Sequence, residues 1–238
     1  MQVTTFGEAL FRLNPPLGVR WENAQTLDVH LGGTELNIAA NLVSLGTTSA
    51  WISILPTGDA GAMMSARLQG TGVEARIPFT AVGDPGWYML EKATRPRGDR
   101  VLTRVKSVLG HLPEVKLDWR TLLKGASWFH TSGVTAGLSE ACTEACLEAL
   151  RTAKAMGLTT SYDLNFRKNL WDHETSLRRQ RPLLPFVDVL VCGQREFDHF
   201  KDDIEGKTLL IPHRDDLETT YWVEAKTPTG ILTSRQFM

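Results

Sequence analysis

The chain has 238 residues, of which 42% are hydrophobic and 22% charged, so it can bury the core of a globular domain and is not disordered as a whole. Its 26 Lys and Arg residues balance 27 Asp and Glu residues, which excludes a general attraction to nucleic acid or to an anionic membrane. The amino terminus lacks a signal-peptide pattern and no stretch is apolar for the roughly 20 residues of a membrane span, so we expect a cytoplasmic protein.

Helices and strands are predicted to alternate over the first 72 residues. Strands at residues 3–6 and 29–31 flank a Pro-rich breaker at 14–18. Thr34 caps a helix with apolar residues at helical spacing, and Gly46 ends it. A strand at residues 50–55 and a helix at 61–72 follow.

The middle of the chain is predicted to leave this pattern and then return to it. Short strands at residues 87–90 and 100–105 form a hairpin excursion within residues 77–109. Alternation resumes with further strands and helices: strands at 127–131, 158–162 and 186–192, and helices at 139–156, 174–183 and 194–200.

Apolar strands separated by amphipathic helices predict an α/β fold with a mostly parallel sheet covered on both faces. No repeat or linker divides the chain, so we expect one domain over residues 1–238, with lid strands within 8–34 and 77–109. The last residues predict a hairpin of strands at 221–225 and 231–236 without a following helix. Because this would leave a sheet edge uncovered, we expect the domain to be incomplete at its carboxyl terminus.

The cysteines do not predict a metal site. Cys142 and Cys146 lie one helical turn apart, but no second ligand pair has suitable spacing. We expect them to be buried small residues in a reducing compartment.

Three segments carry candidate chemistry. In the first, Gly32 and Gly33 precede a helix start, so a polyol or sugar acid could approach the backbone and the first helical N–H groups; a plain tight turn would look the same. In the second, Asp163, Asn165 and Arg167 follow an apolar strand. There Arg167 could clamp a carboxylate, or could form only a surface pair with Asp163.

The third segment holds Glu196, which follows another apolar strand. Its carboxylate could order water around Mg²⁺ bound to nucleotide phosphates, since Mg²⁺ retains several waters. A Glu in the first turn of a helix can equally be a partner of the helix dipole.

Together and in this order, the three segments resemble the PfkB family of carbohydrate kinases. The family's amino-terminal signature is similar to residues 32–42, GGTELNIAANL, followed by Leu45 and Gly46. Residues 7–13 and 163–167, with Leu170 and Trp171, resemble the 2-keto-3-deoxygluconate kinase branch. The resemblance implies a ribokinase-like three-layer α/β/α sandwich with a β lid, ATP and Mg²⁺ as cofactors, and phosphoryl transfer to a sugar-acid hydroxyl.

Site residues are carried over by position. The resemblance implies that Gly33 and Asn37 hold substrate hydroxyls, that Tyr88 reaches in from the lid, and that Arg167 binds the acid end. Arg104 or Lys106 would supply the basic residue of the lid strand. Asn165 would contribute to the cofactor site, and Glu196 to the site of the nucleotide and its magnesium ion.

Three features depart from the family pattern. In the lid strand, residues 103–106 (TRVK) stand where members of the branch carry aromatic residues and an Arg. Gly193 stands where Asn is usual in an Asn-x-x-Glu element, and the sequence contains no Gly-Ala-Gly-Asp segment, which in the family holds the anion hole and the general base. By this resemblance the base would lie beyond Met238, the last residue of the sequence. We therefore name no catalytic residue and expect this chain to be inactive in transfer.

Two alternatives remain open: a sugar-acid-binding protein without catalysis, and a neutral-sugar kinase of the fructokinase or ribokinase type. The expected partners are a sugar acid and a nucleotide, with no nucleic acid and no membrane. An exposed lid strand could also pair with a second copy, which would give a homo-oligomer.

Overall fold

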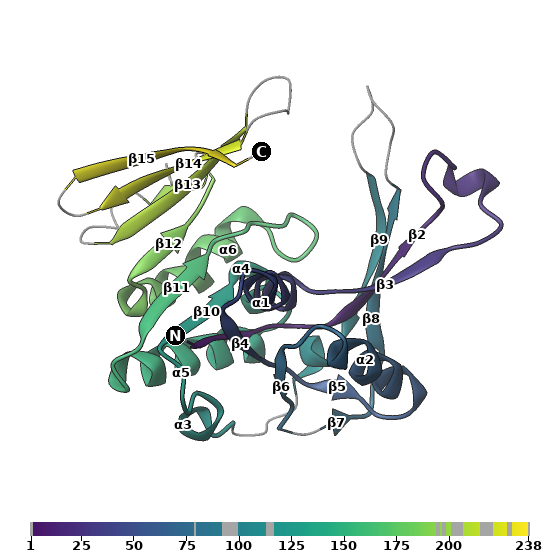
Figure 1. The fold of residues 1–238 in the computed structure, drawn as a ribbon, viewed down its shortest axis with the longest axis horizontal. Coiled ribbons are helices and arrows are strands. Elements are labelled where there is room, and N and C mark those ends of the chain that lie inside the picture. Colours follow the sequence, from purple (N-terminus) through teal and green to yellow (C-terminus); the bar gives the residue numbers. More distant parts are fainter. Residues whose placement is uncertain are drawn as a thin grey trace.

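The computed structural model describes residues 2–78, 80–91, 100–112, 117–193, 196, 199–200, 207–214, 221–227 and 230–237; at 80, at 100–106 and beyond 211 it describes the backbone alone. The largest feature is a nine-stranded sheet in the order β15-β14-β13-β12-β11-β10-β1-β4-β6 (Figure 1). Its first seven strands along the chain are mutually parallel: β1 (Gln2–Phe6), β4 (Thr48–Ile52), β6 (Glu74–Arg76), β10 (Trp128–Ser132), β11 (Thr159–Asp163), β12 (Val189–Val191) and β13 (Thr208–Arg214).

Two further strands extend this sheet at one edge. The strands β14 (Tyr221–Thr227) and β15 (Gly230–Phe237) form an antiparallel hairpin, and β14 is antiparallel to β13. The hairpin predicted at the end of the sequence is confirmed.

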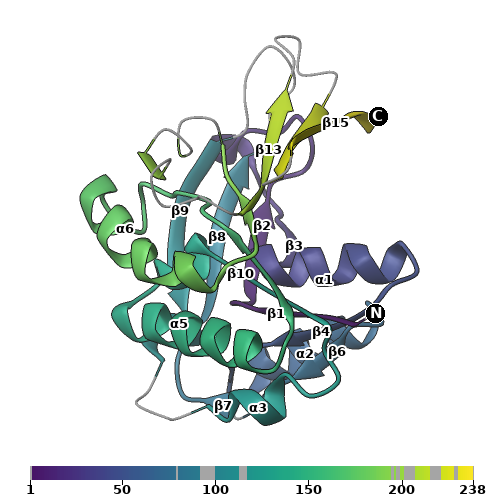
Figure 2. The same cartoon turned by 90° about the vertical axis from the view of Figure 1, so that its left-hand side faces the viewer.

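Helices cover both faces of the sheet (Figure 2). One face carries α1 (Thr34–Ser44) and α2 (Asp59–Gln69), and the other carries α5 (Glu140–Ala155) and α6 (His173–Gln180). There are also two short helices, α3 (Trp119–Leu122) and α4 (Gly133–Ala136), and three 3₁₀ segments: η1 (Trp21–Asn23), η2 (Val108–His111) and η3 (Arg181–Phe186). Residues 196 and 199–200 are helical as well. The predicted α/β class is confirmed.

The core divides into two clusters, one on each side of the sheet. Side chains alternate between the two faces of a strand, so Trp51 packs with Leu36 and Met64 beneath α1 and α2, whereas Ile52 packs in the larger cluster that contains Leu150 of α5. All these side chains are almost fully buried. The helical spacing of apolar residues in α1 and α5 therefore attaches each helix to its face.

A second sheet projects from the first. It consists of β3 (Asp28–Gly32), β2 (Leu10–Asn14), β8 (Pro85–Glu91) and β9 (Arg100–Ser107), in that order (Figure 1). These strands lie in the two stretches where lid strands are expected, and we call them the lid sheet. A two-stranded ribbon, β5 (Leu55–Pro56) with β7 (Thr80–Ala81), lies at its base.

Cys142, Cys146 and Cys192 are all buried and none is in a disulfide, so the predicted burial of the first two is confirmed. No helix in the described part of the chain is long and apolar enough to cross a bilayer.

His130, in the middle of β10, is buried as a neutral ring. Its Nδ1 lies 2.8 Å from Ser161 Oγ, which also accepts a hydrogen bond of 2.7 Å from the indole of Trp128. The Ser161 hydroxyl can donate to Nδ1 or accept from it according to the tautomer of the ring, since its proton can also reach the Phe129 carbonyl oxygen at 3.5 Å. Burial lowers the pKa of His130 from 6.5 to about 4.

This depressed pKa predicts a loss of stability in mild acid. Between pH 7 and 4 the unfolded chain binds a proton that the folded chain does not, so the free energy of unfolding should fall by about 3 kcal/mol through this residue. Urea unfolding of the wild type, His130→Asn and the exposed His111→Asn across this range measures the effect. We expect the His130 variant to lose most of this slope and the His111 variant to keep it; equal slopes in all three would contradict the assignment.

Candidate functional site

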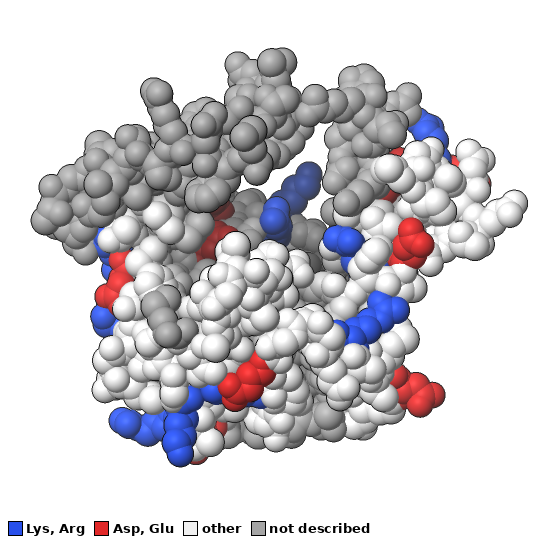
Figure 3. Space-filling model, viewed as in Figure 1, with Lys and Arg blue, Asp and Glu red and all other residues white. Residues whose placement is uncertain are grey.

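A cavity opens at the carboxyl ends of the parallel strands, beneath the lid sheet. Its volume is about 680 Å³, and four predicted substrate residues line it together: Gly33, Asn37, Tyr88 and Arg167. In the sequence Gly33 and Arg167 lie 134 positions apart. The four residues come from the start of α1, from the lid strand β8 and from the loop after β11. Figure 3 shows basic side chains inside a hollow between the body and the lid.

The start of α1 forms one wall of the cavity. Gly33 joins β3 to α1 with φ of +154°, and a Cβ atom at this position would lie 2.2 Å from the carbonyl oxygen of Glu8. Only glycine allows this approach. The Asn37 N–H donates to the Gly33 carbonyl over 2.8 Å and begins the helix, while the first-turn N–H groups have no partner within the helix itself. A ligand oxygen is well suited to accept from them.

A buried carboxylate, which the sequence analysis did not select, holds this wall in place. Glu35 Oε1 accepts hydrogen bonds from Ser132 Oγ at 2.5 Å and Thr135 Oγ1 at 2.8 Å, and Thr5 Oγ1 donates to the Glu35 carbonyl oxygen. Burial raises the pKa of the Glu35 carboxyl, and the two hydroxyl donors oppose that rise. The hydrogen bonds of Glu35 therefore connect α1 to β1, β10 and α4.

The lid sheet forms the opposite wall through Tyr88 and Leu90 of β8. Arg104 of β9 pairs directly with Tyr88 in the sheet, so its backbone lies beside the cavity wall. The side chains of Arg104 and Lys106 lie outside the described residues.

The loop after β11 presents Arg167. Asn165 adopts φ of +37°, a conformation that Asn tolerates, and its backbone N–H and side-chain amide donate to the two oxygens of Asp163 at 3.1 and 3.2 Å. The resulting turn places Arg167 on the cavity wall, where its side chain is exposed. Asn165, which we predicted for the cofactor site, is held in this turn and is not among the lining residues.

Glu196 lies on the other side of Phe166. Its two oxygens accept backbone hydrogen bonds from Phe166 at 2.6 Å and from Gly193 at 2.7 Å. It lines a smaller, nearly apolar cavity of about 260 Å³, and Phe166 lines both cavities. Burial and the nearby Glu196 charge raise the pKa of Asp163 to about 7.

Glu196 therefore joins the loops that follow β11 and β12. Each of its oxygens retains a lone pair for a water around Mg²⁺, which suits an ion that takes few protein ligands directly. Among the described residues, no group of three or more His, Cys, Asp or Glu side chains could hold a metal by itself.

The general base stays a prediction. The resemblance assigns it to a Gly-Ala-Gly-Asp segment, which residues 1–238 do not contain. We therefore assign this role to none of the described residues.

Glu196→Gln should destabilise the protein. Its amide can accept from only one of the two backbone N–H groups and faces the other with a donor, so we expect about 2 kcal/mol lower free energy of unfolding. Urea unfolding against Glu174→Gln, an exposed control in α6, measures this difference. A change as small as the control's would mean that the carboxylate does not join the two loops.

Other lining residues were not selected from the sequence. They are Glu8, Leu10, Thr34, Leu90, Val134, Phe166, Lys168 and Asn169. Glu8 follows the carboxyl end of β1 and Val134 that of β10, so the rule that ligands bind at strand ends would have indicated both.

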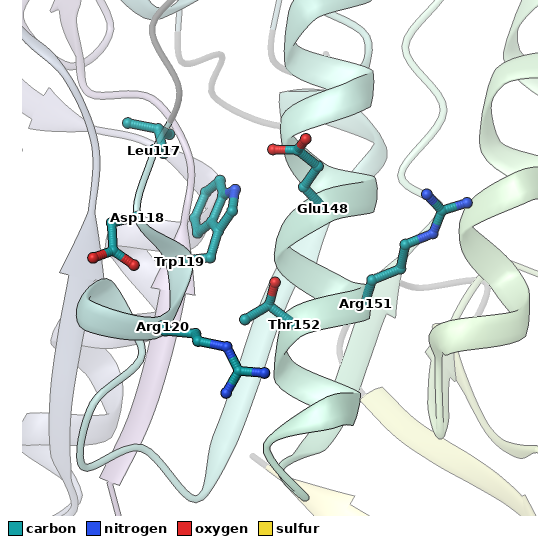
Figure 4. Close-up of a pocket in the computed structure, with 7 residues that line it drawn as sticks. All are labelled: Leu117, Asp118, Trp119, Arg120, Glu148, Arg151 and Thr152. Atoms are coloured by element: carbon teal, nitrogen blue, oxygen red, sulfur yellow. The ribbon is translucent and has the colours of Figure 1, made fainter.

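A further cavity of about 570 Å³ lies between α3 and α5 (Figure 4). It is lined by residues of both charges, including Asp118 and Arg120 on one side and Glu148 and Arg151 on the other. Because α3 leads into β10, this cavity lies near the amino ends of the strands, away from the predicted site residues. We assign no ligand to it.

Comparison with known proteins identifies a family and relatives that resemble this chain. Residues 2–208 match the pfkB family of carbohydrate kinases. The 2-dehydro-3-deoxygalactonokinase of Haloferax volcanii is 35% identical over 198 residues, which are 82% of this chain and 61% of that protein. The 2-dehydro-3-deoxygluconokinase of Bacillus subtilis is 25% identical over 201 residues, again 82% of this chain and 61% of the relative. The chain thus spans about three-fifths of the length of these relatives.

Solved structures agree with the family match. The crystal structure of 2-dehydro-3-deoxygluconokinase from Thermotoga maritima has a TM-score of 0.88 and 28% identity, covering 100% of this chain and 80% of that one. A PfkB family carbohydrate kinase from Listeria grayi has a TM-score of 0.86 and 28% identity, covering 99% and 78%. The chain belongs to the pfkB family of carbohydrate kinases and has its ribokinase-like fold.

Proposed function

We propose that residues 1–238 form one ribokinase-like domain that binds the substrate of an ATP-dependent sugar-acid kinase, with 2-keto-3-deoxygluconate as the substrate. The observation that carries this proposal is that Arg167 lines the same cavity as Gly33, Asn37 and Tyr88. A neutral sugar needs hydroxyl partners alone, whereas a sugar acid also needs a cation for its carboxylate. The names of the two relatives and of the Thermotoga structure support the same substrate class.

Each wall of the cavity has a role in this proposal. The helix start at Gly33 and the amide of Asn37 bind sugar hydroxyls, and Tyr88 closes the cavity from the lid. Arg167 pairs with the carboxylate, and Arg104 is placed in the lid strand beside Tyr88. These contacts would fix which hydroxyl points toward the nucleotide.

In the transfer reaction, the sugar hydroxyl oxygen bonds to the γ-phosphorus of ATP while the bond to the β-phosphate oxygen breaks, and the hydroxyl proton passes to a base. When bound, Mg²⁺ would supply positive charge to the phosphates, and Glu196 would order its waters, with Asn165 nearby. Because the sequence up to Met238 has no Gly-Ala-Gly-Asp segment, we assign no base and expect sugar-acid binding without transfer from these residues.

A second candidate is a sugar-acid-binding protein without a catalytic role. Gly193 in place of the family's Asn favours it, since that change weakens the nucleotide side of the site and leaves the sugar cavity intact. A neutral-sugar kinase of the fructokinase type is a third candidate, and the exposed cation of Arg167 in the cavity argues against it.

Calorimetric titration of the chain with 2-keto-3-deoxygluconate, fructose and ATP with Mg²⁺ tests the proposal. We expect saturable binding of the sugar acid and little binding of fructose. Tighter binding of fructose would favour the neutral-sugar alternative. If the folded chain binds neither sugar, the proposed substrate class is wrong.

A further inference from the structure

The lid sheet carries a second basic residue on the face that closes the cavity. Arg12 of β2 is paired with Tyr88 of β8, which lines the cavity, and Leu13 is paired with Met89 in the same register. Leu10, two residues before Arg12, lines the cavity as well. Arg12 is not itself a lining residue, but its neighbours Leu10, along the strand, and Tyr88, across the sheet, both line the cavity.

The opposite face of the lid sheet confirms this orientation. Phe11 and Leu13 of β2, and Trp87 of β8, pack with the hydrophobic cluster beneath α1 and α2. Successive residues of a strand point to opposite faces, so Arg12 points away from that cluster and toward the cavity side. The pairing of Arg12 with His30 on one side and of Tyr88 with Arg104 on the other makes a cross-strand row that is rich in basic residues.

The guanidinium of Arg12 also has an unmet hydrogen-bonding requirement. Its Nε atom is buried, and none of the described residues accepts a hydrogen bond from it. A buried donor on a charged group is costly when it has no acceptor. A rotation of the Arg12 side chain toward the cavity would allow an anionic ligand to supply that acceptor.

We propose that Arg12 is a further substrate-binding residue, which helps to select an anionic sugar from the lid side while Arg167 acts from the main sheet. This inference rests on the proposed function, since it adds a further basic residue to the same substrate site. A guanidinium suits this position because its donors bind a carboxylate in a fixed geometry. The lid would then contribute charge as well as shape to the recognition of the sugar acid.

The test compares binding of 2-keto-3-deoxygluconate by the wild-type chain, Arg12→Gln, Arg12→Lys and a matched control, Arg67→Gln. Arg67 lies 6.0 Å from the Phe11 ring and donates to the Val29 carbonyl, so its loss also removes a cation that contacts the lid sheet. We expect Arg12→Gln to weaken binding at least about tenfold, Arg12→Lys to be intermediate, and Arg67→Gln to match the wild type. Raising the salt concentration should weaken wild-type binding more than binding by Arg12→Gln.

The outcomes separate the two proposals. Equal affinity for Arg12→Gln and Arg67→Gln, with wild-type binding intact, overturns the role of Arg12 and leaves the proposed function standing. If the wild type does not bind the sugar acid, both proposals are wrong. Circular dichroism and thermal unfolding verify each fold; if Arg12→Gln does not fold, Arg12→Lys carries the test, and wild-type affinity in that variant overturns the inference.

Discussion

Arg167→Ala is expected to weaken binding of 2-keto-3-deoxygluconate by about 10- to 100-fold and to leave the unfolding temperature nearly unchanged. A hydrogen bond to a charged group contributes about 1.5 to 3 kcal/mol, and a bidentate pair with a carboxylate lies toward the upper end of this range. Because the Arg167 side chain is exposed, its removal creates no core cavity. Isothermal titration calorimetry measures the affinity.

Arg178→Ala is the matched control for this experiment, because Arg178 is an exposed arginine of the neighbouring helix α6 and does not line the cavity. We expect wild-type affinity from it. If Arg167→Ala and Arg178→Ala bind the sugar acid equally well, Arg167 does not hold the carboxylate, and the argument for an acid substrate loses its main support.

Gly33→Ala should have the largest effect on both binding and stability. The added Cβ would lie 2.2 Å from the backbone oxygen of Glu8, far inside contact distance, and φ of +154° is also unfavourable for alanine. Either the start of α1 or the strand end at Glu8 must move. We expect a loss of about 3 kcal/mol or more in the free energy of unfolding and no measurable sugar-acid binding.

Gly46→Ala is the control that measures backbone strain without steric overlap. Gly46 lies at the other end of α1 with φ of +83°, and no atom lies within 4 Å of an added Cβ. Its cost should be about 1 kcal/mol, with binding retained. Urea unfolding and calorimetry on both variants give the comparison. A stable Gly33→Ala variant that binds as the wild type would show that the close approach to Glu8 is not required.

Much of the fold could be predicted from local patterns. The strand predicted at residues 3–6 is β1, the helix from Thr34 is α1, and the long amphipathic helix is α5 within one residue of its predicted ends. These elements have strong periodicity and clear caps; Ser139, for example, accepts from the Cys142 N–H. The predicted helix at residues 194–200 falls mostly outside the described residues, and those described, 196 and 199–200, are helical.

Four strands were not predicted: β2, β6, β13 and the two-residue β7. The strand β2 is a five-residue segment directly before Pro15 and Pro16, and β13 contains Pro212, which argues against an interior strand. The strand β6 has only three residues and pairs with β4 at the sheet edge. Short segments of this kind become strands because distant partners complete their hydrogen bonds, and that information is absent from the segment itself.

The single strand predicted over residues 50–55 is wrong in its extent. The structure has β4 at Thr48–Ile52 and a separate β5 at Leu55–Pro56. Ser53 and Ile54 interrupt the chain where it leaves the main sheet for the small ribbon with β7. An apolar run alone does not show the point at which a strand changes its partner.

Residue types and local spacing were sufficient to determine the α/β class, the glycine turn before α1, and Arg167 at a strand end. These depend on short-range backbone geometry and on periodicity, which a sequence displays directly. Only the tertiary structure decided that Gly33, Asn37, Tyr88 and Arg167 line one cavity. It also decided that Glu35 forms hydrogen bonds behind the wall of this cavity, and that Arg12 pairs with Tyr88 in the lid sheet. Sheet register and the pairing of distant strands set those positions, and contacts between residues some hundred positions apart leave no periodic signal in the sequence.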